Sequence, residues 1–390
     1  MLVSQNLTKE FSNSMRFLQK ILSSKNFRDL KYLITSIIKF KTLVLSHLFD
    51  ENKVSSSKKK FVERISNMLA KLPNDIFDII KNRSAKLTKK YSDNDIKIVS
   101  YDWTDIAKPK SKKMPLLSRI FDPSSKSYYK WYLVHWVFID SFLYNLELIK
   151  PKYDDKEQKY KADYSKSNWE KIFYETIEIF GLEKTIHIFD RFYDDKKFIY
   201  TVHSKTNNYL IRWKTNRKVV LKKTGEKIWV WELKEGKYRV IVDKVETNLY
   251  VVNSKKEGKL LIYSGLEKSL KEIKELYLKR WDIETAFKNT KEFWLEKVRL
   301  QDFDKIKKIL VILQFIYNTI RKLYIRINKS KVGILGIIFK VFDKFIRKRN
   351  LNNNFHAFMT FFSQKIYVSE LPNFGLLMGK TLFDVSLFAT

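Results

Sequence analysis

The order of strand-like and helix-like segments between residues 95 and 213 most constrains the fold of this chain. Five segments alternate as strands do, and two have the apolar spacing of a helix. We expect the strands at 96–101, 128–140, 144–149, 185–189 and 209–213, and the helices at 165–180 and 196–203. The first and fourth strands are each followed directly by an acid, Asp102 and Asp190. This β-β-β-α-β-α-β order predicts an α/β fold, a mixed sheet flanked by helices.

The segments on either side of this core differ from it in character. Residues 1 to about 90 have only helical spacing, with Lys on the remaining faces. Short alternating segments broken by turn signals are expected at 218–221, 228–233, 238–245 and 249–253, and helical spacing returns after Ser269. The expected parts are a helical N-terminal domain with a possible DNA-binding role (1–94), the first part of the core (95–214), a β-rich insertion (215–268), the remaining core helices (269–330) and a mixed C-terminal segment (331–390).

The charge balance points to a polyanion as partner. The chain of 390 residues has 77 Lys and Arg against 43 Asp and Glu, a net charge of +34. Nucleic acid is the simplest polyanion to fit this excess. The many Lys, Asn and Ile residues would also follow from an AT-biased genome, but such bias does not force so large an imbalance of sign.

Composition also excludes several classes of site. The chain has no cysteine, which rules out disulfides, cysteine-type zinc fingers and a thiol nucleophile. Its first residues lack the basic and apolar stretches of a secretory signal, and no apolar run approaches the roughly 20 residues needed to cross a bilayer. We therefore expect a cytoplasmic protein with no membrane partner.

The segment 269–297 is expected to form one amphipathic helix that presents an acid beside its buried edge. At about 100° per residue, one stripe of this helix holds Tyr277, Arg280, Glu284, Lys288 and Lys291. An apolar seam borders the stripe and consists of Leu276, Ile283, Phe287 and Trp294. Taken alone, the stripe is better explained by surface ion pairs four residues apart, Arg280–Glu284 and Glu284–Lys288.

Two strand-end aspartates and one helical glutamate form the ligand set that two Mg²⁺ ions need for phosphoryl transfer. Hard cations take oxygen ligands, and two such ions can activate an attacking oxygen and stabilise a leaving one. Asp102, Asp190 and Glu284 are the candidates for these ligands. Arg280 and Lys291 suit phosphate groups nearby.

Three motifs in order resemble one known family. The spacing of Tyr277, Arg280, Glu284 and Lys291 is similar to the YREK signature of insertion-sequence DDE transposases of the IS-four type. The residues DRFYD that begin at Asp190 resemble the block that holds the family's second acid. The residues DWTDIAK that begin at Asp102 resemble the block of its first acid. Residues 250–253 resemble the strand that closes the family's insertion. The resemblance covers about residues 95–300.

The resemblance implies an RNase H-like core, interrupted by a mainly β insertion before the glutamate helix. It implies excision of a DNA element and its strand transfer into target DNA, with two Mg²⁺ ions, replaceable by Mn²⁺, held by Asp102, Asp190 and Glu284. It implies double-stranded DNA, both terminal inverted repeats and target, as partner, a homodimer in the DNA complex and a prokaryotic, nucleoid-associated location. Residues that would hold DNA are Tyr277, Arg280, Lys288 and Lys291. Candidates for stacking on a flipped base are Trp229, Trp231 and Trp281, although strand or core packing is the ordinary role of a tryptophan.

Two departures and several rival residues accompany the resemblance. Phe192 stands where the family usually has Gly, and bulky Trp103 follows the first acid. Asp105 and Asp194 are the nearest rivals of the two chosen aspartates. His135 and His187 lie in strand-like runs and are expected in the core or on a sheet face. A basic loop, suited to phosphate contact or merely solvated, consists of Lys108, Lys110, Lys112 and Lys113.

Two other functions compete with an active transposase. One is a transposase-derived DNA-binding protein that no longer cuts, and the other is a structure-selective RNase H-like nuclease. The carboxylate trio argues against the first, and the YREK stripe and β insertion argue against the second.

Overall fold

The fold divides into two compact units, one built on a sheet and one helical. The structure, a computed structural model, describes residues 2–366 except 52, 53, 55, 93, 109, 110, 112, 113, 123–126, 141, 162, 164, 165, 194, 195, 243, 255–257, 282, 285, 287–289, 291–297, 299, 331, 332 and 350–354. The helical unit comprises Met1–Pro73, Lys297–Arg299 and Ser330–Thr390, and the sheet unit comprises Asn74–Glu296 and Leu300–Lys329.

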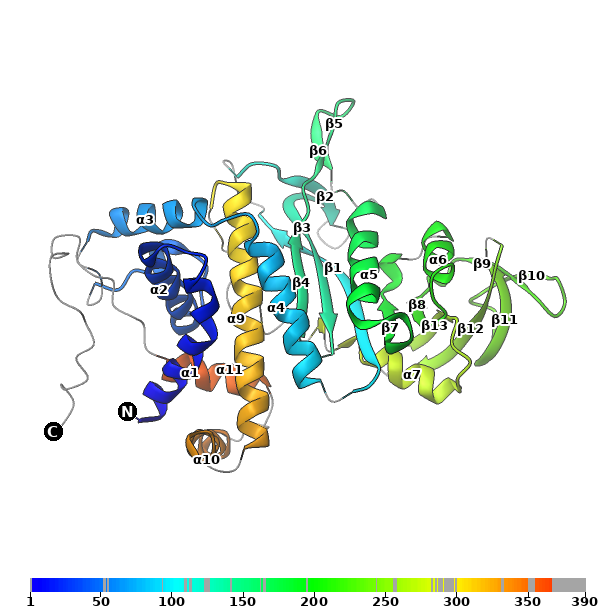
Figure 1. Cartoon of the computed structure of the whole chain (residues 1–390). Helices are drawn as coiled ribbons and strands as arrows, with labels where there is room; N and C mark the ends of the chain where they lie inside the picture. The colour runs from blue at the N-terminus through cyan, green and yellow to red at the C-terminus, as the bar shows by residue number, and fades with distance from the viewer. Residues whose placement is uncertain are drawn as a thin grey trace. The chain divides into compact units, whose positions relative to one another are not determined.

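The sheet unit is organised around one mixed sheet (Figure 1), in the order β10-β9-β11-β12-β13-β8-β7-β1-β3-β2, with β4 also paired to β3. The strands of its core half are β1 (Lys97–Ala107), β2 (Ser118–Asp122), β3 (Ser127–Ile139), β4 (Phe142–Leu148), β7 (Thr185–Phe189) and β8 (Tyr209–Arg212). Those of the insertion are β9 (Lys218–Leu221), β10 (Lys227–Trp229), β11 (Gly236–Val242), β12 (Val245–Ser254) and β13 (Gly258–Ser264). Because β13 pairs with β8, the insertion continues the core sheet.

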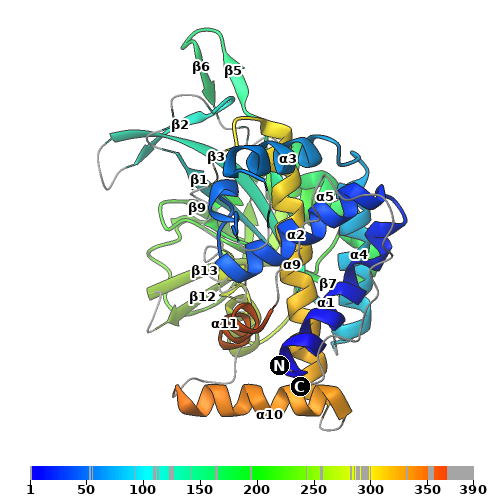
Figure 2. The ribbon, with the colours of Figure 1, turned by 90° about the vertical axis from the view of Figure 1, so that its left-hand side faces the viewer.

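A small hairpin stands apart from the main sheet. It consists of β5 (Lys152–Asp154) and β6 (Lys159–Lys161), which pair only with each other in the described chain. Figures 1 and 2 both show the hairpin projecting beyond the sheet near β2.

Helices cover both faces of the core sheet. Alternate residues of each strand point to opposite faces, so one apolar set packs on helices α5 (Lys166–Phe180) and α6 (Lys196–His203). The other set packs on α7 (Leu270–Leu278), with Ile98, Ile188 and Tyr277 in the same buried cluster. Short 3₁₀ helices η2 (Leu182–Lys184) and η3 (Arg191–Tyr193) flank β7. The result is the three-layer arrangement of an RNase H-like fold, and the expected α/β class is confirmed.

Two long helices anchor the edge strand β4. These are α4 (Ile76–Tyr91) and α9 (Phe303–Lys329), which pack on each other and on β4. Buried Asn318 of α9 accepts a hydrogen bond from the backbone N–H of Leu143 (2.9 Å) and donates one to its carbonyl (2.7 Å). The Asn318 amide therefore takes the place of a neighbouring strand at Leu143. Without it, the backbone N–H and carbonyl of Leu143 would lose these hydrogen bonds.

The helical unit joins the two ends of the described chain. It contains α1 (Leu2–Gln19), α2 (Ser24–Phe40), η1 (Leu45–His47), α3 (Lys58–Ala70), α10 (Gly333–Lys348) and α11 (Phe355–Lys365). Helices α10 and α11 both pack on α1, and α11 also packs on α2. An ion pair joins Arg64 of α3 to the buried carboxylate of Asp29 on α2. None of the described helices is long and apolar enough to span a bilayer.

The structure differs from the sequence-based expectations in four ways. The first strand does not end at Asp102 but continues to Ala107, because β3 pairs with it over that whole length. The segment 228–233 is a strand only as far as Trp229, and β13 intervenes between residues 250–253 and α7. The expected single helix from 269 is interrupted, since α7 ends at Leu278. Helix α4 groups with the sheet, and the residues after 330 group with the N-terminal helices.

Candidate active site

The two chosen aspartates lie side by side on neighbouring strands. Strands β1 and β7 are parallel, and their register pairs Tyr101 with Phe189. The next residue in each case is the acid, Asp102 within β1 and Asp190 directly after β7, so the two acids meet at the same level of the sheet. By strand alternation both share the face of Ile98 and Ile188, which is the face covered by α7.

The pKa of Asp102 depends on its burial and on the charges around it. Burial raises the pKa of the Asp102 carboxyl, and the neighbouring Asp190 carboxylate raises it further, to about 7. Arg280 and a 2.8 Å hydrogen bond from the Trp103 backbone N–H act in the opposite direction. Two acids brought together in a poorly hydrated place favour a proton or another cation between them.

Arg280 supplies such a cation from the turn that follows α7. Hydrogen bonds of the i to i+3 type run from Lys279 N–H to Leu276 and from Arg280 N–H to Tyr277, which tighten the chain at this point. The guanidinium is only 4% exposed, and its Nη1 lies 3.7 Å from an Asp102 carboxylate oxygen. Burial lowers the pKa of this guanidinium, but Tyr277 and the surrounding carboxylates raise it more, so its pKa lies above the ordinary value. Arg280 is therefore a permanent cation inside the acid cluster.

Glu284 reaches the cluster through the same arginine. Its Oε1 accepts a 2.7 Å hydrogen bond from Arg280 Nη2, and the Glu284 side chain is 38% exposed. The pair has the i,i+4 spacing of a surface ion pair, yet its arginine is buried and also faces Asp102. The structure thus brings Asp102, Asp190 and Glu284 around one guanidinium.

Three residues expected to hold DNA have different outcomes. Tyr277 is fully buried in the apolar cluster between α7 and the sheet, so its side chain is not exposed in this conformation, and its contact with phosphates stays a prediction. Its position on the helix faces inward because α7 packs directly on the sheet. Lys288 and Lys291 lie outside the described residues.

The structure describes one of the two rival acids and one of the four lysines of the basic loop. Asp105 is an odd number of residues from Asp102 on β1, so it points to the opposite face of the sheet from Arg280. Asp194 lies outside the described residues, as do Lys110, Lys112 and Lys113. Lys108 is buried rather than solvated, because its backbone continues the pairing of β1 with β3 through a hydrogen bond to Lys130.

The turn after Asp190 accommodates Phe192 without strain. It is the 3₁₀ helix η3, closed by a 3.0 Å hydrogen bond from Tyr193 N–H to the Asp190 carbonyl. Phe192 does not have a positive φ angle, so nothing in the turn requires glycine. Its side chain is 51% exposed beside the acid cluster.

The donor set fits a divalent cation. Asp190 Oδ1 is buried and has no hydrogen-bond partner, which is unusual for a carboxylate oxygen and leaves it available as a ligand. Within the described part of the chain, however, no three acidic or histidine side chains converge closely enough to enclose a metal. Arg280 occupies the position between Asp102 and Glu284 where a metal would compete with it.

A layer of histidine and aromatic side chains lies on the opposite face of the sheet from the aspartates, and the sequence predicted its histidines in the core or on a sheet face. His187 is bonded to the hydroxyls of Tyr101 (3.0 Å) and Thr185 (3.1 Å). His135 Nε2 lies 3.0 Å from the Tyr193 hydroxyl, and its ring contacts that of Trp103 in a tilted arrangement. Both histidines are fully buried, and burial lowers the pKa of each to about 3.

The tryptophans proposed for base stacking lie on the surface of the insertion or beside Arg280. Trp229 and Trp231 are both exposed, so the alternative of core packing does not hold for them. The ammonium of Lys218 lies 4.4 Å from the centre of the Trp229 ring. Trp281 is half-buried, and the Arg280 guanidinium lies 5.9 Å from its ring centre.

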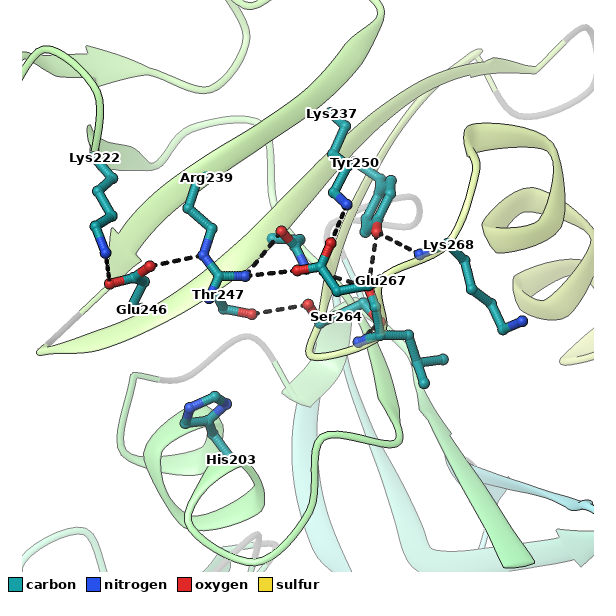
Figure 3. Close-up of polar contacts among 12 residues, drawn as sticks. His203, Lys222, Lys237, Arg239, Glu246, Thr247, Tyr250, Ser264, Glu267 and Lys268 are labelled. Carbon is teal, nitrogen blue, oxygen red and sulfur yellow. Dashed lines mark hydrogen bonds and ion pairs between the residues drawn. The ribbon is translucent and has the colours of Figure 1, made fainter. Parts of the chain in front are cut away.

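An ion-pair network fixes the link between the insertion and α7 (Figure 3). Glu267 accepts hydrogen bonds from Arg239 Nη1 (2.9 Å) and from Asn248 (2.9 Å), and it also pairs with Lys237. Arg239 extends the network to Glu246, at 2.8 Å from Nε. One link residue, Glu267, is thus tied to three residues of β11 and β12.

Backbone contacts also hold the segment that links the insertion to α7. The buried Tyr250 hydroxyl donates to the Leu266 carbonyl (2.7 Å) and accepts from the Lys268 N–H (3.2 Å), as Figure 3 shows. A Cβ at Gly265 would lie 2.5 Å from the backbone oxygen of Asn207, so this position requires glycine. Ser269 and Glu272 then form a capping box at the start of α7. The helix that leads to Arg280 therefore starts from a defined point on the sheet.

A protein-family model matches the part of the chain that contains these acids. The model of one protein family, described as "Transposase DDE domain", matches residues 93–319, which is more than half of the chain. The matched range contains all three acids and the whole β insertion. No curated protein matches the chain significantly.

Proposed function

This chain belongs to the family of transposases with a DDE domain, and we propose that it excises DNA ends and joins them to target DNA with Asp102, Asp190 and Glu284 as ligands of two Mg²⁺ ions. One observation carries the proposal: Asp102 and Asp190 lie side by side on parallel strands, on the sheet face where Arg280 and Glu284 lie. Membership of the family implies a metal-dependent enzyme that acts on DNA. The choice of ion, with Mn²⁺ as a substitute, and the insertion-sequence subtype are parts of the proposal.

Each acid has a defined task in this scheme. When bound, Mg²⁺ lowers the pKa of an attacking water or 3′ hydroxyl and neutralises charge on the phosphate. Asp102 and Asp190 are held rigidly by β1 and by the end of β7, so they fix the position at which the reacting phosphate is bound. Glu284 completes the set from the helical segment after Arg280.

Basic residues would bind the DNA backbone around this centre. Arg280, released from the carboxylates when a metal binds there, can offer its planar fork to a phosphate. We include Lys288 and Lys291 in this role on the strength of the YREK spacing, and Trp229, Trp231 and Trp281 as candidates for base stacking. The partners proposed are terminal inverted repeats and target DNA, with two copies of the chain in the complex.

The test is cleavage of a labelled DNA end in Mg²⁺ by the wild type and by Asp102→Ala, Asp190→Ala and Glu284→Ala. We expect each variant to lose cleavage by about 1,000-fold or more while still binding DNA. Asp105→Ala is the matched control, because this acid lies on the same strand but on the opposite face. Equal cleavage by all five proteins would exclude the metal-site assignment.

Other outcomes decide between the functional classes. DNA binding without cleavage by any protein, the wild type included, would favour a transposase-derived binding protein. Cleavage without joining to a second DNA would favour a nuclease. Lys291→Ala should weaken binding of the DNA end and make its salt dependence shallower by about one ion, as expected for one lost phosphate contact.

A further inference from the structure

One buried histidine contacts residues adjoining both catalytic aspartates. His135 of β3 is fully buried and is the cross-strand partner of Trp103 on β1. The two rings lie 4.4 Å apart between centroids, at 31° between their planes. On its other side, His135 Nε2 lies 3.0 Å from the hydroxyl of Tyr193.

These two contacts lead directly to the acids. Trp103 follows Asp102, and its backbone N–H donates to the Asp102 carboxylate at 2.8 Å. Tyr193 ends the turn that starts at Asp190, and its N–H donates to the Asp190 carbonyl at 3.0 Å. A single imidazole therefore connects the residue that orients the first acid to the turn that orients the second.

We propose that His135 is a positioning residue that sets the spacing between Asp102 and Asp190 through Trp103 and Tyr193. The inference rests on the proposed metal site. Two carboxylates that share cations must hold their separation closely, and groups that orient metal ligands commonly change metal affinity about 10- to 100-fold when they are removed. The β1–β3 pairing and the β1–β7 pairing each fix a backbone, but His135 is the side chain that joins β3 to the turn after β7.

His187 shows what an ordinary buried histidine does in the same layer. It is equally buried, and it bonds to Tyr101 and Thr185 rather than to the turn after Asp190. Its loss should lower stability without changing the spacing of the acids. His187→Gln is therefore the matched control for a change at His135.

The experiment measures Mn²⁺ binding by calorimetry to the full chain without DNA, with urea unfolding measured on the same samples. His135→Phe keeps a ring against Trp103 but loses the hydrogen bond, and His135→Gln keeps a polar group near Tyr193 but loses the ring. We expect His135→Phe and Tyr193→Phe to weaken Mn²⁺ binding about 10-fold or more. His135→Gln should recover part of that loss, and His187→Gln should stay within about threefold of wild type.

Cleavage kinetics give a second, independent readout. We expect kcat for the DNA end to fall in His135→Phe while KM stays near that of wild type, because the DNA-contacting surface is unchanged. If His135→Phe does not fold, Tyr193→Phe carries the same test, since it removes the other half of the hydrogen bond.

Two results would overturn the inference. One is wild-type Mn²⁺ affinity in both His135→Phe and Tyr193→Phe. The other is an equal loss of affinity in His187→Gln at equal loss of stability, which would mean that any damage to this layer has the same effect. Equal Mn²⁺ binding by the wild type and Asp102→Ala would have a different meaning. It would exclude the proposed metal site itself, and with it the inference about His135.

Discussion

Arg280 is the cation that compensates the negative charge of the carboxylates in the site. Its guanidinium is buried next to Asp102 and Glu284, and its pKa is held above the ordinary value by Tyr277 and the nearby carboxylates. Without a metal, this arginine is the counter-ion of the acids. A metal at the same carboxylates would compensate the same charge, so the two cations compete.

This competition predicts an unusual result for Arg280→Gln. The metal-free variant should be less stable than wild type by about 3 kcal/mol, because a buried carboxylate loses its partner. Its melting temperature should then rise more than that of wild type when Mg²⁺ is added, because binding to vacant carboxylates no longer displaces a cation. Differential scanning calorimetry with and without Mg²⁺ measures both effects. Arg280→Lys, which keeps the charge, is the control, and an equal Mg²⁺ shift in Arg280→Gln and wild type would contradict the competition.

The buried His187 makes the free energy of unfolding depend on pH. Burial lowers the pKa of its imidazole to about 3 in the folded chain, against about 6.5 when unfolded. Because the pKa of His187 is lower in the folded chain than in the unfolded chain, burying the neutral imidazole costs nothing above about pH 6.5. The free energy of unfolding then decreases as the pH falls toward 3. Between pH 7 and pH 5, His187 should cost about 2 kcal/mol of unfolding free energy. Urea unfolding at both pH values checks this, and His187→Gln should reduce the difference by that amount. A difference unchanged by the substitution would mean that His187 is protonated in the folded state.

At the scale of elements, the sequence predicted those strands and helices whose patterns are local. The limits of β7 and β9 agree with the expected segments, and α5 and α6 agree to within a residue. The extent of β1 could not be read in this way, because residues beyond Asp102 are held as strand by pairing with β3. Likewise, the periodicity from 269 to 297 gave no sign of the turn at Arg280, which places the guanidinium next to Asp102, a residue far away in the sequence.

The same limit applies to the site. Motif spacing and expected strand ends made Asp102, Asp190 and Glu284 the candidate ligands, and the structure places these three near Arg280. Neither motif nor periodicity could reveal that Tyr277 is buried or that His135 contacts Tyr193, because both facts depend on elements far apart in sequence. Strand parity could have separated Asp105 from Asp102 in advance, since residues three apart on a strand face opposite sides.

The edge strand β4 depends on one amide of α9. Asn318 satisfies both backbone groups of Leu143 and also donates to Ser84 at 2.8 Å. Asn318→Leu should therefore lower the unfolding free energy by about 3 kcal/mol, because three buried polar groups lose a partner. Urea unfolding measures this loss. The matched control is Asn328→Leu, a half-buried asparagine ten residues further along the same helix. Equal losses in the two variants would mean that the bond to Leu143 contributes nothing particular.

At the scale of the whole molecule, the two ends of the described chain depend on each other for folding. Helices α10 and α11 pack on α1 and α2, and Phe11 lies 5.7 Å from Phe362 between ring centroids. Three apolar clusters of the sheet unit consist of residues between 85 and 277. Deleting residues 330–390 should therefore expose the apolar faces of α1 and α2 and leave the sheet folded. Hydrogen exchange followed by mass spectrometry should show rapid exchange in peptides of α1 and α2, with protection in β1 and β7 unchanged. Equal loss of protection in both sets would mean that the chain unfolds as a single cooperative unit, and retained protection in α1 and α2 would mean that these helices form a stable core without the C-terminal segment.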